Sequence, residues 1–146
     1  MATLHHEIII KAPIEKVWNI LINLKEVGKY NPHITSVKYS SEQEGVGASR
    51  ECQLEQGFAK ERITAMEDLK SISMEMYESD FPLKYMKWTY YLSFKNGITA
   101  LKTISEYKIK YGFLGVILNH VVMKSKFDKT MKEVFESLKK YAETKK

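Results

Sequence analysis

The stretch from Ile34 to Lys110 constrains the fold most, because short extended runs alternate there with closely spaced turn signals. The turns fall at residues 44–47, 56–57, 67–71, 79–82 and 96–97, and they separate about six runs of period-two character. Asn96-Gly97 is a strong hairpin signal, since a type I′ turn needs positive φ at both central residues. Connections this short predict an antiparallel meander.

Another strand and a helical region precede this meander. Residues 3–11 end in EIIIK and predict a strand. Pro13 suits the first position of a helix, and Ala12 then becomes an N-cap without a side-chain acceptor. Gly28 and Pro32 end the helical region around a short second turn. Within the first helix, apolar residues recur at helical spacing: Ile14, Val17, Trp18 and Leu21.

From about Gly115 the sequence predicts one long helix, which no proline interrupts. Its apolar stripe rotates by roughly a third of a turn at about 100° per residue. Either the helix crosses a strongly curved sheet, or its first half is a separate element near a cavity mouth. The first stripe is Leu114, Ile117, Leu118 and Val121, and the second is Phe127, Met131, Val134, Phe135 and Leu138.

These elements predict an α+β fold in a single domain spanning residues 1–146, with seven antiparallel strands and a long C-terminal helix. A sheet of this size twists and curls, and the long helix is the natural partner for its concave apolar face. One helix does not fill such a curve completely. We therefore expect an internal cavity of the kind that binds small molecules.

Composition and charge narrow the function classes. The net charge is +5, but only Arg50 and Arg62 are arginines, so we expect no nucleic-acid partner. The single Cys52 and the absence of metal-ligand spacing among the four histidines predict neither a disulfide, a metal site nor a cofactor. Without an 18-residue apolar run or a signal-peptide pattern, we expect a cytoplasmic protein with no transmembrane segment.

Several segments carry a family resemblance that spans nearly the whole chain: APIEKVWNILINLKEVGKYNPHITSVK, GVGASRECQL, KERI and the terminal helix. Together they resemble the START-like, or helix-grip, superfamily of polyketide cyclase/dehydrase-like and birch-pollen-allergen-type (Bet v 1-like) proteins. The resemblance implies a curved sheet around the long helix, two short helices between strands 1 and 2, and a cavity for hydrophobic molecules.

One branch of this superfamily, the plant abscisic-acid receptors, allows a comparison of single positions. Its ligand-pairing lysine corresponds to Asn31 here, so the contact of a lysine with a ligand carboxylate is lost. Its inward glutamate corresponds to Glu61, which alternation places on one strand face with Ala59, Ile63 and Ala65. The gate loop is shorter and the latch motif is absent, so the resemblance does not imply hormone sensing by that mechanism.

The candidate site residues each have two readings. Glu61 is either a buried carboxylate that binds a polar ligand end or acts as acid or base, or half of an ion pair with Arg50, Arg62 or a lysine. His33 is a polar group at the cavity or an exposed loop residue. Lys124, Ser125 and Asp128 face either the cavity or solvent, with Lys124 and Asp128 paired at i,i+4. The apolar lining or core residues are Met74, Met76, Met86, Trp88, Tyr90, Phe127 and Met131.

The preferred hypothesis is binding or transport of a hydrophobic small molecule, such as a lipid or an aromatic or polyketide-like compound. It is preferred to an enzyme because no complete catalytic constellation is present. The first alternative is a cyclase or dehydratase with Glu61 as acid or base and a tyrosine or histidine as hydrogen-bond donor. A second alternative, also known in the superfamily, is a module that binds a protein partner through an exposed apolar patch.

Overall fold

The computed structural model describes residues 2–39, 44–55, 57–110, 112, 114, 117 and 122–145. Its helices are α1 (Ile14–Ile22), the short 3-10 turn η1 (Leu24–Glu26), α2 (Val27–Tyr30) and the long α4 (Lys124–Thr144). Its strands are β1 (Ala2–Ile10), β2 (Ile34–Tyr39), β3 (Ser49–Leu54), β4 (Gly57–Glu67), β5 (Ser71–Ser79), β6 (Leu83–Lys95) and β7 (Ile98–Ile109).

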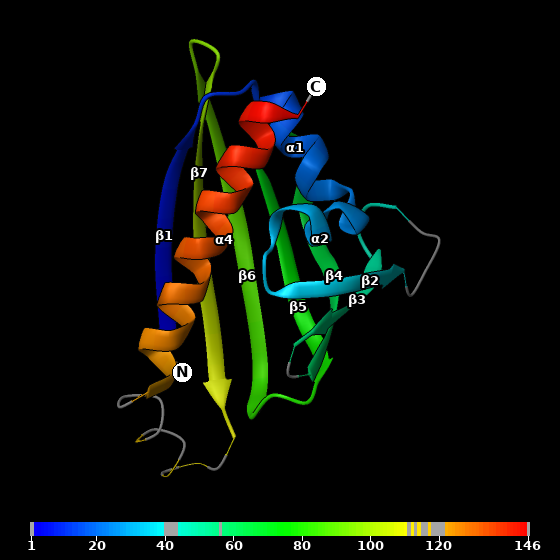
Figure 1. Ribbon diagram of the computed structural model, residues 1–146, viewed down its shortest axis with the longest axis vertical. Coiled ribbons are helices and arrows are strands. Elements are labelled where there is room, and N and C mark those ends of the chain that lie inside the picture. Colours follow the sequence, from blue (N-terminus) through cyan, green and yellow to red (C-terminus); the bar gives the residue numbers. More distant parts are fainter. Residues whose placement is uncertain are drawn as a thin grey trace.

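The strands form one seven-stranded antiparallel sheet in the order β1-β7-β6-β5-β4-β3-β2. Strands β2 to β7 are thus the predicted meander, and β1 pairs with β7 at the other edge of the sheet. In Figure 1, α4 lies over one face of the sheet, and α1 and α2 lie beside it. The predicted helix-grip architecture is confirmed.

Local backbone geometry explains where the strands turn and where alternation fails. Asn96 and Gly97 have φ values of 53° and 78°, as the predicted type I′ turn requires. The pairing of β4 with β5 shifts register between Ile63 and Ala65. This irregularity inverts the alternation, so Ile63 is buried whereas Ala65 is exposed. The prediction that Ala65 shares the inward face with Glu61 is therefore wrong.

Helix α1 is held by its apolar face. Val17, Trp18 and Leu21 are all buried, as the helical spacing predicted. The helix begins one residue later than expected, with Pro13 instead of Ala12 at the N-cap position, and no side chain caps it. Since the cap contributes no side-chain hydrogen bond, packing of this face is the main source of stability for the helix.

The second half of the C-terminal helix follows the prediction. α4 begins at Lys124, and most of the expected first half, including Leu118 and Val121, lies outside the described residues. Leu114 and Ile117 are exposed. The buried residues of α4 are Val134, Phe135, Leu138 and Ala142, the first three of which belong to the predicted second stripe.

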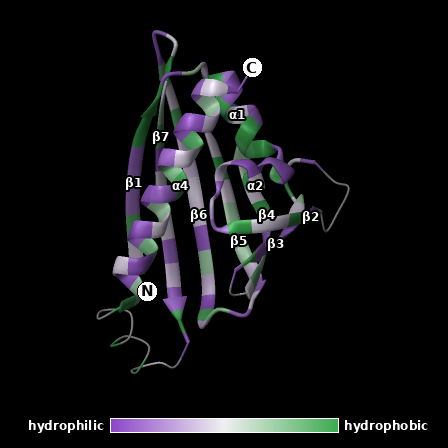
Figure 2. Ribbon diagram, in the orientation of Figure 1, coloured by the Kyte–Doolittle hydropathy of each residue, from purple (hydrophilic) through white to green (hydrophobic). Residues whose placement is uncertain are grey.

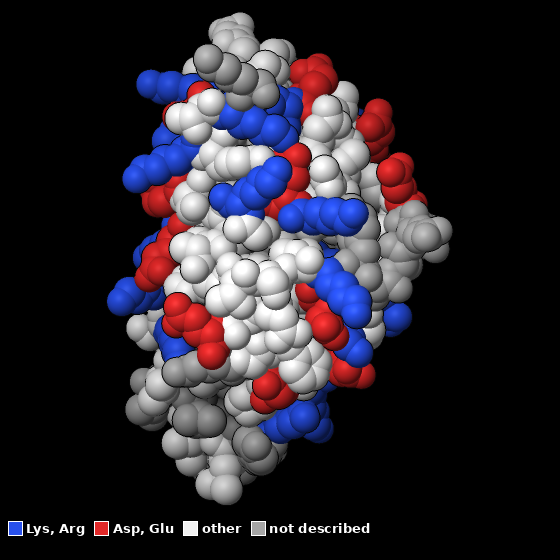
Figure 3. Space-filling view, turned by 45° about the vertical axis from the view of Figure 1, so that its right-hand side comes forward, with Lys and Arg blue, Asp and Glu red and all other residues white. Residues whose placement is uncertain are grey.

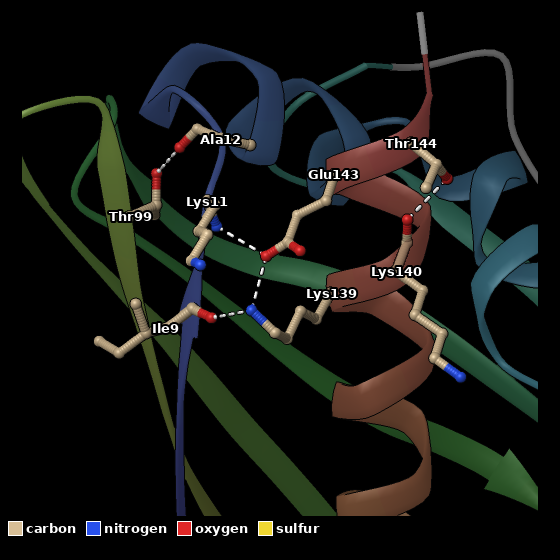
Figure 4. A network of polar contacts seen from close by, with 8 residues as sticks. All are labelled: Ile9, Lys11, Ala12, Thr99, Lys139, Lys140, Glu143 and Thr144. Atoms are coloured by element: carbon tan, nitrogen blue, oxygen red, sulfur yellow. Dashed lines mark hydrogen bonds and ion pairs between the residues drawn. The ribbon is translucent and has the colours of Figure 1, made fainter.

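Polar contacts fix the C-terminal end of α4 to the end of β1 (Figure 4). Lys139 Nζ donates to the carbonyl oxygen of Ile9 at 2.8 Å and lies 2.6 Å from Oε2 of Glu143. The same carboxylate oxygen accepts from the backbone N–H of Lys11 at 2.8 Å. Beside it, the Thr99 hydroxyl donates to the carbonyl oxygen of Ala12 at 2.7 Å. The strand end and the helix end are thus joined by backbone and side-chain groups together.

The core lies between the concave face of the sheet and the helices. Inward residues of neighbouring strands, such as Ile72, Met74 and Leu101, are almost completely buried. Hydrophilic and hydrophobic residues alternate along the strands and α4 in Figure 2. Within the described ranges, no helix is long and apolar enough to cross a bilayer.

Candidate functional site

A cavity of about 440 Å³ lies between the sheet, α4, and the segment that joins α2 to β2. Strands β3 to β7 supply its wall, and α4 supplies one long side. The lining residues are Val27, Tyr30, Asn31, His33, Ile34, Arg50, Cys52, Leu54, Glu55, Ala59, Glu61, Met76, Phe81, Met86, Trp88, Tyr90, Ser105, Lys126, Phe127, Thr130, Met131 and Val134. Most of these side chains are apolar or aromatic, as in small-molecule sites generally.

The structure brings most of the predicted site residues to this one cavity. The predicted residues that line the cavity are Glu61, His33, Met76, Met86, Trp88, Tyr90, Phe127 and Met131. Met74 does not line it. Met74 faces the same side of the sheet, but it is only 1% exposed and belongs to the packed core with its cross-strand neighbours Ile63 and Trp88.

The polar part of the cavity wall is an ion pair between adjacent strands. Arg50 on β3 lies opposite Glu61 on β4, and both Nε and Nη2 of Arg50 are 2.8 Å from Oε1 of Glu61. Nη1 of Arg50 also donates to the carbonyl oxygen of Leu24 at 3.3 Å. The side chains are 3% and 13% exposed, so this pair is in the interior and not at a strand edge.

The positive charge of Arg50 is balanced by the negative charge of Glu61. Burial has the largest single effect and lowers the pKa of Arg50, but the carboxylate of Glu61 and the neighbouring Tyr30, Cys52 and Tyr90 together raise it above its ordinary value. Arg50 therefore remains a cation and Glu61 supplies its counter-charge. Glu61 therefore fits both interpretations made from the sequence, because its carboxylate pairs with Arg50 and also lines the cavity.

Two buried tyrosines lie beside the ion pair. Burial is the main cause that raises the pKa of Tyr30, and the nearby Arg50 opposes it only in part. Burial and then Tyr30 raise the pKa of Tyr90. Both phenols therefore stay protonated and are available as neutral hydrogen-bond donors. We refer below to Tyr30, Arg50, Glu61 and Tyr90 as the polar cluster.

Cys52 is next to the polar cluster but is not a nucleophile. Burial, followed by the charge of Glu61, raises the pKa of its thiol to about 12. The side chain is 1% exposed, and Sγ lies 3.8 Å from Oε1 of Glu61. A thiol that remains protonated and buried behaves as a small apolar residue, as the sequence predicted.

The rim of the cavity is formed by the α2–β2 connection and α4. Nε2 of His33 lies 2.9 Å from Oε2 of Glu133 on α4, and the backbone N–H of His33 donates to Oδ1 of Asn31 at 3.0 Å. Glu55 and Lys126 line the cavity and are exposed, so they mark the side open to solvent. Figure 3 shows an uncharged area on this side of the molecule, bordered by charged side chains.

The three polar residues left undecided on the C-terminal helix do not face the cavity. Lys124 and Ser125 are exposed and are not part of the lining. Asp128 binds Lys132 at 3.0 Å and His6 of β1 at 2.8 Å, instead of the expected Lys124. The polar residues that α4 contributes to the lining are Lys126 and Thr130.

Sequence reasoning did not assign Tyr30 to the site. The sequence named Arg50 only as one possible partner of Glu61, because the predicted turn at 56–57 would place residue 50 opposite residue 63, whereas the structure places it opposite Glu61. The sequence contains no signal for Tyr30. Its helix α2 has only four residues, too few for a periodic pattern to show which face is inward.

The site combines a large apolar surface with hydrogen-bonding groups whose charges balance. Among the described residues, no three histidine, cysteine or carboxylate side chains gather as metal ligands would. An apolar compound with an uncharged oxygen function matches this lining, because an unpaired ligand charge meets no free counter-charge at the polar cluster.

Comparisons with known proteins agree with this fold. The protein TTHA0849 from Thermus thermophilus aligns with a TM-score of 0.80 at 16% identity, covering 97% of each chain. A START superfamily protein from Mycobacterium smegmatis aligns with a TM-score of 0.80 at 12% identity, also covering 97% of each chain. XoxI from Bacillus cereus aligns with a TM-score of 0.76 at 14% identity, covering 96% of this chain and 94% of that one.

At these identities the structural similarity shows the fold alone. No match was found among curated protein sequences. The family model described as "Polyketide cyclase / dehydrase and lipid transport" matches residues 1–143. The chain therefore belongs to the polyketide cyclase/dehydrase and lipid transport family.

Proposed function

We propose that this protein binds or carries a hydrophobic small molecule that has an uncharged oxygen group at one end. The observation that supports this most strongly is the arrangement of the cavity. Its wall is largely apolar, but the polar cluster is buried on one side of it. The apolar surface supplies affinity, and the buried donors fix the orientation of the ligand.

The charge balance of the polar cluster supports an uncharged end group over a carboxylate. Glu61 already neutralises Arg50, and a second carboxylate at the same guanidinium would repel Glu61. A hydroxyl or carbonyl oxygen can instead accept a hydrogen bond from a tyrosine hydroxyl without separating the ion pair. We therefore expect alcohols, phenols and ketones to bind in preference to fatty acids of equal size.

A thermal-shift panel tests this proposal. It pairs long-chain alcohols and fused-ring phenols with the corresponding carboxylic acids and with the unsubstituted hydrocarbons. The alcohols and phenols should raise the unfolding temperature most, since a ligand that binds only the folded state stabilises it by mass action. Absence of stabilisation by every compound in the panel would refute the proposed function.

A matched pair of tyrosine variants locates the binding site. Tyr30→Phe removes a hydroxyl from the polar cluster, whereas Tyr91→Phe removes one from an exposed position on β6. We expect Tyr30→Phe to weaken binding of the phenols by about 2- to 12-fold, the equivalent of one hydrogen bond, and to leave the hydrocarbons unaffected. Tyr91→Phe should bind both kinds of compound like the wild type.

A cyclase or dehydratase reaction is the second candidate, because the Glu61 carboxylate faces the cavity beside two tyrosine hydroxyls. In that case Glu61 would move a proton of the bound compound. Incubation of the panel hits with the protein, followed by mass spectrometry, tests for turnover. Product that forms with the wild type and not with Glu61→Gln would favour the enzyme over the carrier.

A further inference from the structure

The positive charge of the chain is concentrated in one segment. Residues 108–132 contain six lysines and one acidic residue, so they carry the whole net charge of +5, and the rest of the chain has equal numbers of basic and acidic residues. Lys132 pairs with Asp128 at 3.0 Å. The other five lysines are exposed, and none forms an ion pair with a described residue. We call these five the basic set: Lys108, Lys110, Lys124, Lys126 and Lys129.

Packing brings the two parts of the basic set together in space. Tyr107 of β7 and Phe127 of α4 are in edge-to-face contact, with ring centroids 4.9 Å apart. Met123 also packs against the buried cluster that contains Ile109. The lysines at the end of β7 and those in the first turns of α4 therefore lie at the same end of the molecule, opposite the β6–β7 hairpin (Figure 1).

Exposed apolar side chains lie between the lysines of the basic set in the sequence. Leu114, Ile117 and Val122 are 70%, 47% and 49% exposed, respectively. Among the residues that the structure describes, Leu114 is the most exposed of the large apolar side chains. Apolar groups in water beside unpaired positive charges are typical of a surface that binds a membrane interface.

The residues at this end of the molecule favour a lipid bilayer over other anionic partners. A nucleic acid would offer phosphates to the lysines, but it would leave the three apolar side chains in water. An acidic protein would need a surface whose shape matches those side chains. A bilayer presents phosphates across a plane, and its interface accepts apolar side chains without a fitted pocket.

We propose that the basic set and the three exposed apolar residues form a surface that docks on an anionic phospholipid bilayer. The lysines contact lipid phosphates, and the apolar side chains enter the interface between headgroups and acyl chains. Each lysine near such a surface increases the affinity by about fivefold. This inference goes beyond the proposed function and does not require the cavity to bind any compound. Lys126 and Phe127 also line the cavity, so docking places that part of its wall beside the bilayer.

Sedimentation with phospholipid vesicles tests the docking. The vesicles consist of phosphatidylcholine alone, or of phosphatidylcholine with one third phosphatidylglycerol, each at low and at high salt. The wild type should sediment with the anionic vesicles at low salt, and the bound fraction should fall at high salt because the lysines are screened. Equal binding to both kinds of vesicle, or binding to neither, would overturn the proposal.

A matched pair of charge variants assigns the binding to the basic set. Lys124→Gln combined with Lys129→Gln removes two of its charges, and neither residue lines the cavity. The control combines Lys38→Gln with Lys95→Gln, which removes two exposed lysines from β2 and from the end of β6. The first double variant should bind anionic vesicles about 25-fold more weakly than the wild type, and the control less than about threefold more weakly. Equal losses in the two double variants would show that only the net charge matters.

A second pair of variants tests the apolar contribution. Leu114→Ser should weaken binding to anionic vesicles by about tenfold, because less apolar surface leaves water. Phe94→Ser removes a side chain that is 53% exposed on β6, near the opposite end of the molecule, and should bind like the wild type. If Leu114→Ser binds as well as the wild type and duplex DNA displaces the vesicles, the surface is a general polyanion site and the bilayer proposal fails.

The outcomes are independent of the proposed function. Thermal-shift results with apolar compounds report on the cavity, and vesicle sedimentation of the protein without such compounds reports on the docking surface. Urea unfolding of every variant checks that each is folded, so that lost sedimentation is assigned to the surface and not to unfolding.

Discussion

The Arg50–Glu61 pair is the residue-level feature with the largest expected effect on stability. Glu61→Ala leaves a buried guanidinium without its counter-charge, since Arg50 is 3% exposed. Removing one partner of a buried ion pair costs about 3–5 kcal/mol. We therefore expect the free energy of unfolding, measured in urea, to fall by about that amount. Loss of less than about 1 kcal/mol would show that the pair is solvated.

The double variant separates the pair interaction from the cost of an unpaired charge. Arg50→Met combined with Glu61→Leu removes both charges and keeps apolar volume in the wall. We expect it to be more stable than Glu61→Ala alone, because hydrophobic replacement of a buried pair is often neutral or stabilising. Strictly additive effects of the two single changes would contradict direct coupling.

Cys52 offers a second residue-level prediction. Burial and the charge of Glu61 raise the pKa of its thiol to about 12, and thiolate is the form that reacts. In the folded protein near pH 8, we expect a disulfide reagent to modify Cys52 far more slowly than in urea. The release of the coloured thiolate of the reagent measures both rates. Equal rates in the two conditions would show that the cavity wall opens freely.

At the residue scale, strand alternation explains both the success and the failures of prediction. The inward direction of Glu61 followed from period two, but the same rule failed at Ala65 because a register shift intervenes. Alternation also assigned Met74 to the correct face. Alternation did not show whether Met74 contacts packed side chains or the cavity, because that depends on which residues pack against this face of the sheet.

Among the elements, the contact between α4 and β1 depends on a charged cluster. Asp128 of α4 binds Lys132 and His6. The hydrogen bond from Lys132, followed by that from His6, lowers the pKa of Asp128 below its ordinary value. This interaction stabilises the fold above the unfolded-state pKa of about 3.9 and is lost as the pH falls through the lower folded-state value.

The corresponding prediction compares Asp128→Asn with the wild type. Near pH 7 the variant should unfold at a lower urea concentration, and the difference should shrink progressively as the pH falls below about 3.9, the unfolded-state pKa of an aspartate. Lys129→Ala, which changes an exposed charge on the same helix, is the control. A difference between Asp128→Asn and the wild type that is constant across this pH range would contradict the charge contact.

The elements themselves were predictable to different degrees. The hairpin at Asn96-Gly97 requires a backbone conformation that this dipeptide favours locally, so its position followed from two residues. The start of the C-terminal helix has no such local marker: Met123 precedes it and contributes no side-chain cap. Met123 itself has helical backbone angles, so a helical sequence pattern does not mark this boundary.

At the scale of the whole molecule, the cavity follows from the proportions of the fold. Seven strands curve around one long helix, and α1 and α2 lie beside that helix. The inward side chains near α1 and the C-terminal half of α4 meet and pack, for example Trp18, Leu101 and Leu138. Toward the start of α4, the space between the helix and strands β3 to β6 is left open. The same sheet face is therefore core at one end and binding site at the other.

Two buried alanines, one in the cavity wall and one in the packed core, test whether the interior is open at one end and packed at the other. Ala59 on β4 is 2% exposed and lines the cavity, whereas Ala142 on α4 is 0% exposed and lies in the packed core. A leucine at position 59 can extend into open space, so Ala59→Leu should unfold in urea within about 0.5 kcal/mol of the wild type. It should also weaken binding of the best panel compound at least about tenfold, because the leucine occupies ligand volume.

Ala142→Leu has no such space, so its free energy of unfolding should fall by about 1–3 kcal/mol through overpacking. Equal destabilisation by the two substitutions would mean that the interior near Ala59 is as tightly packed as the core, and that the cavity does not exist as a binding space.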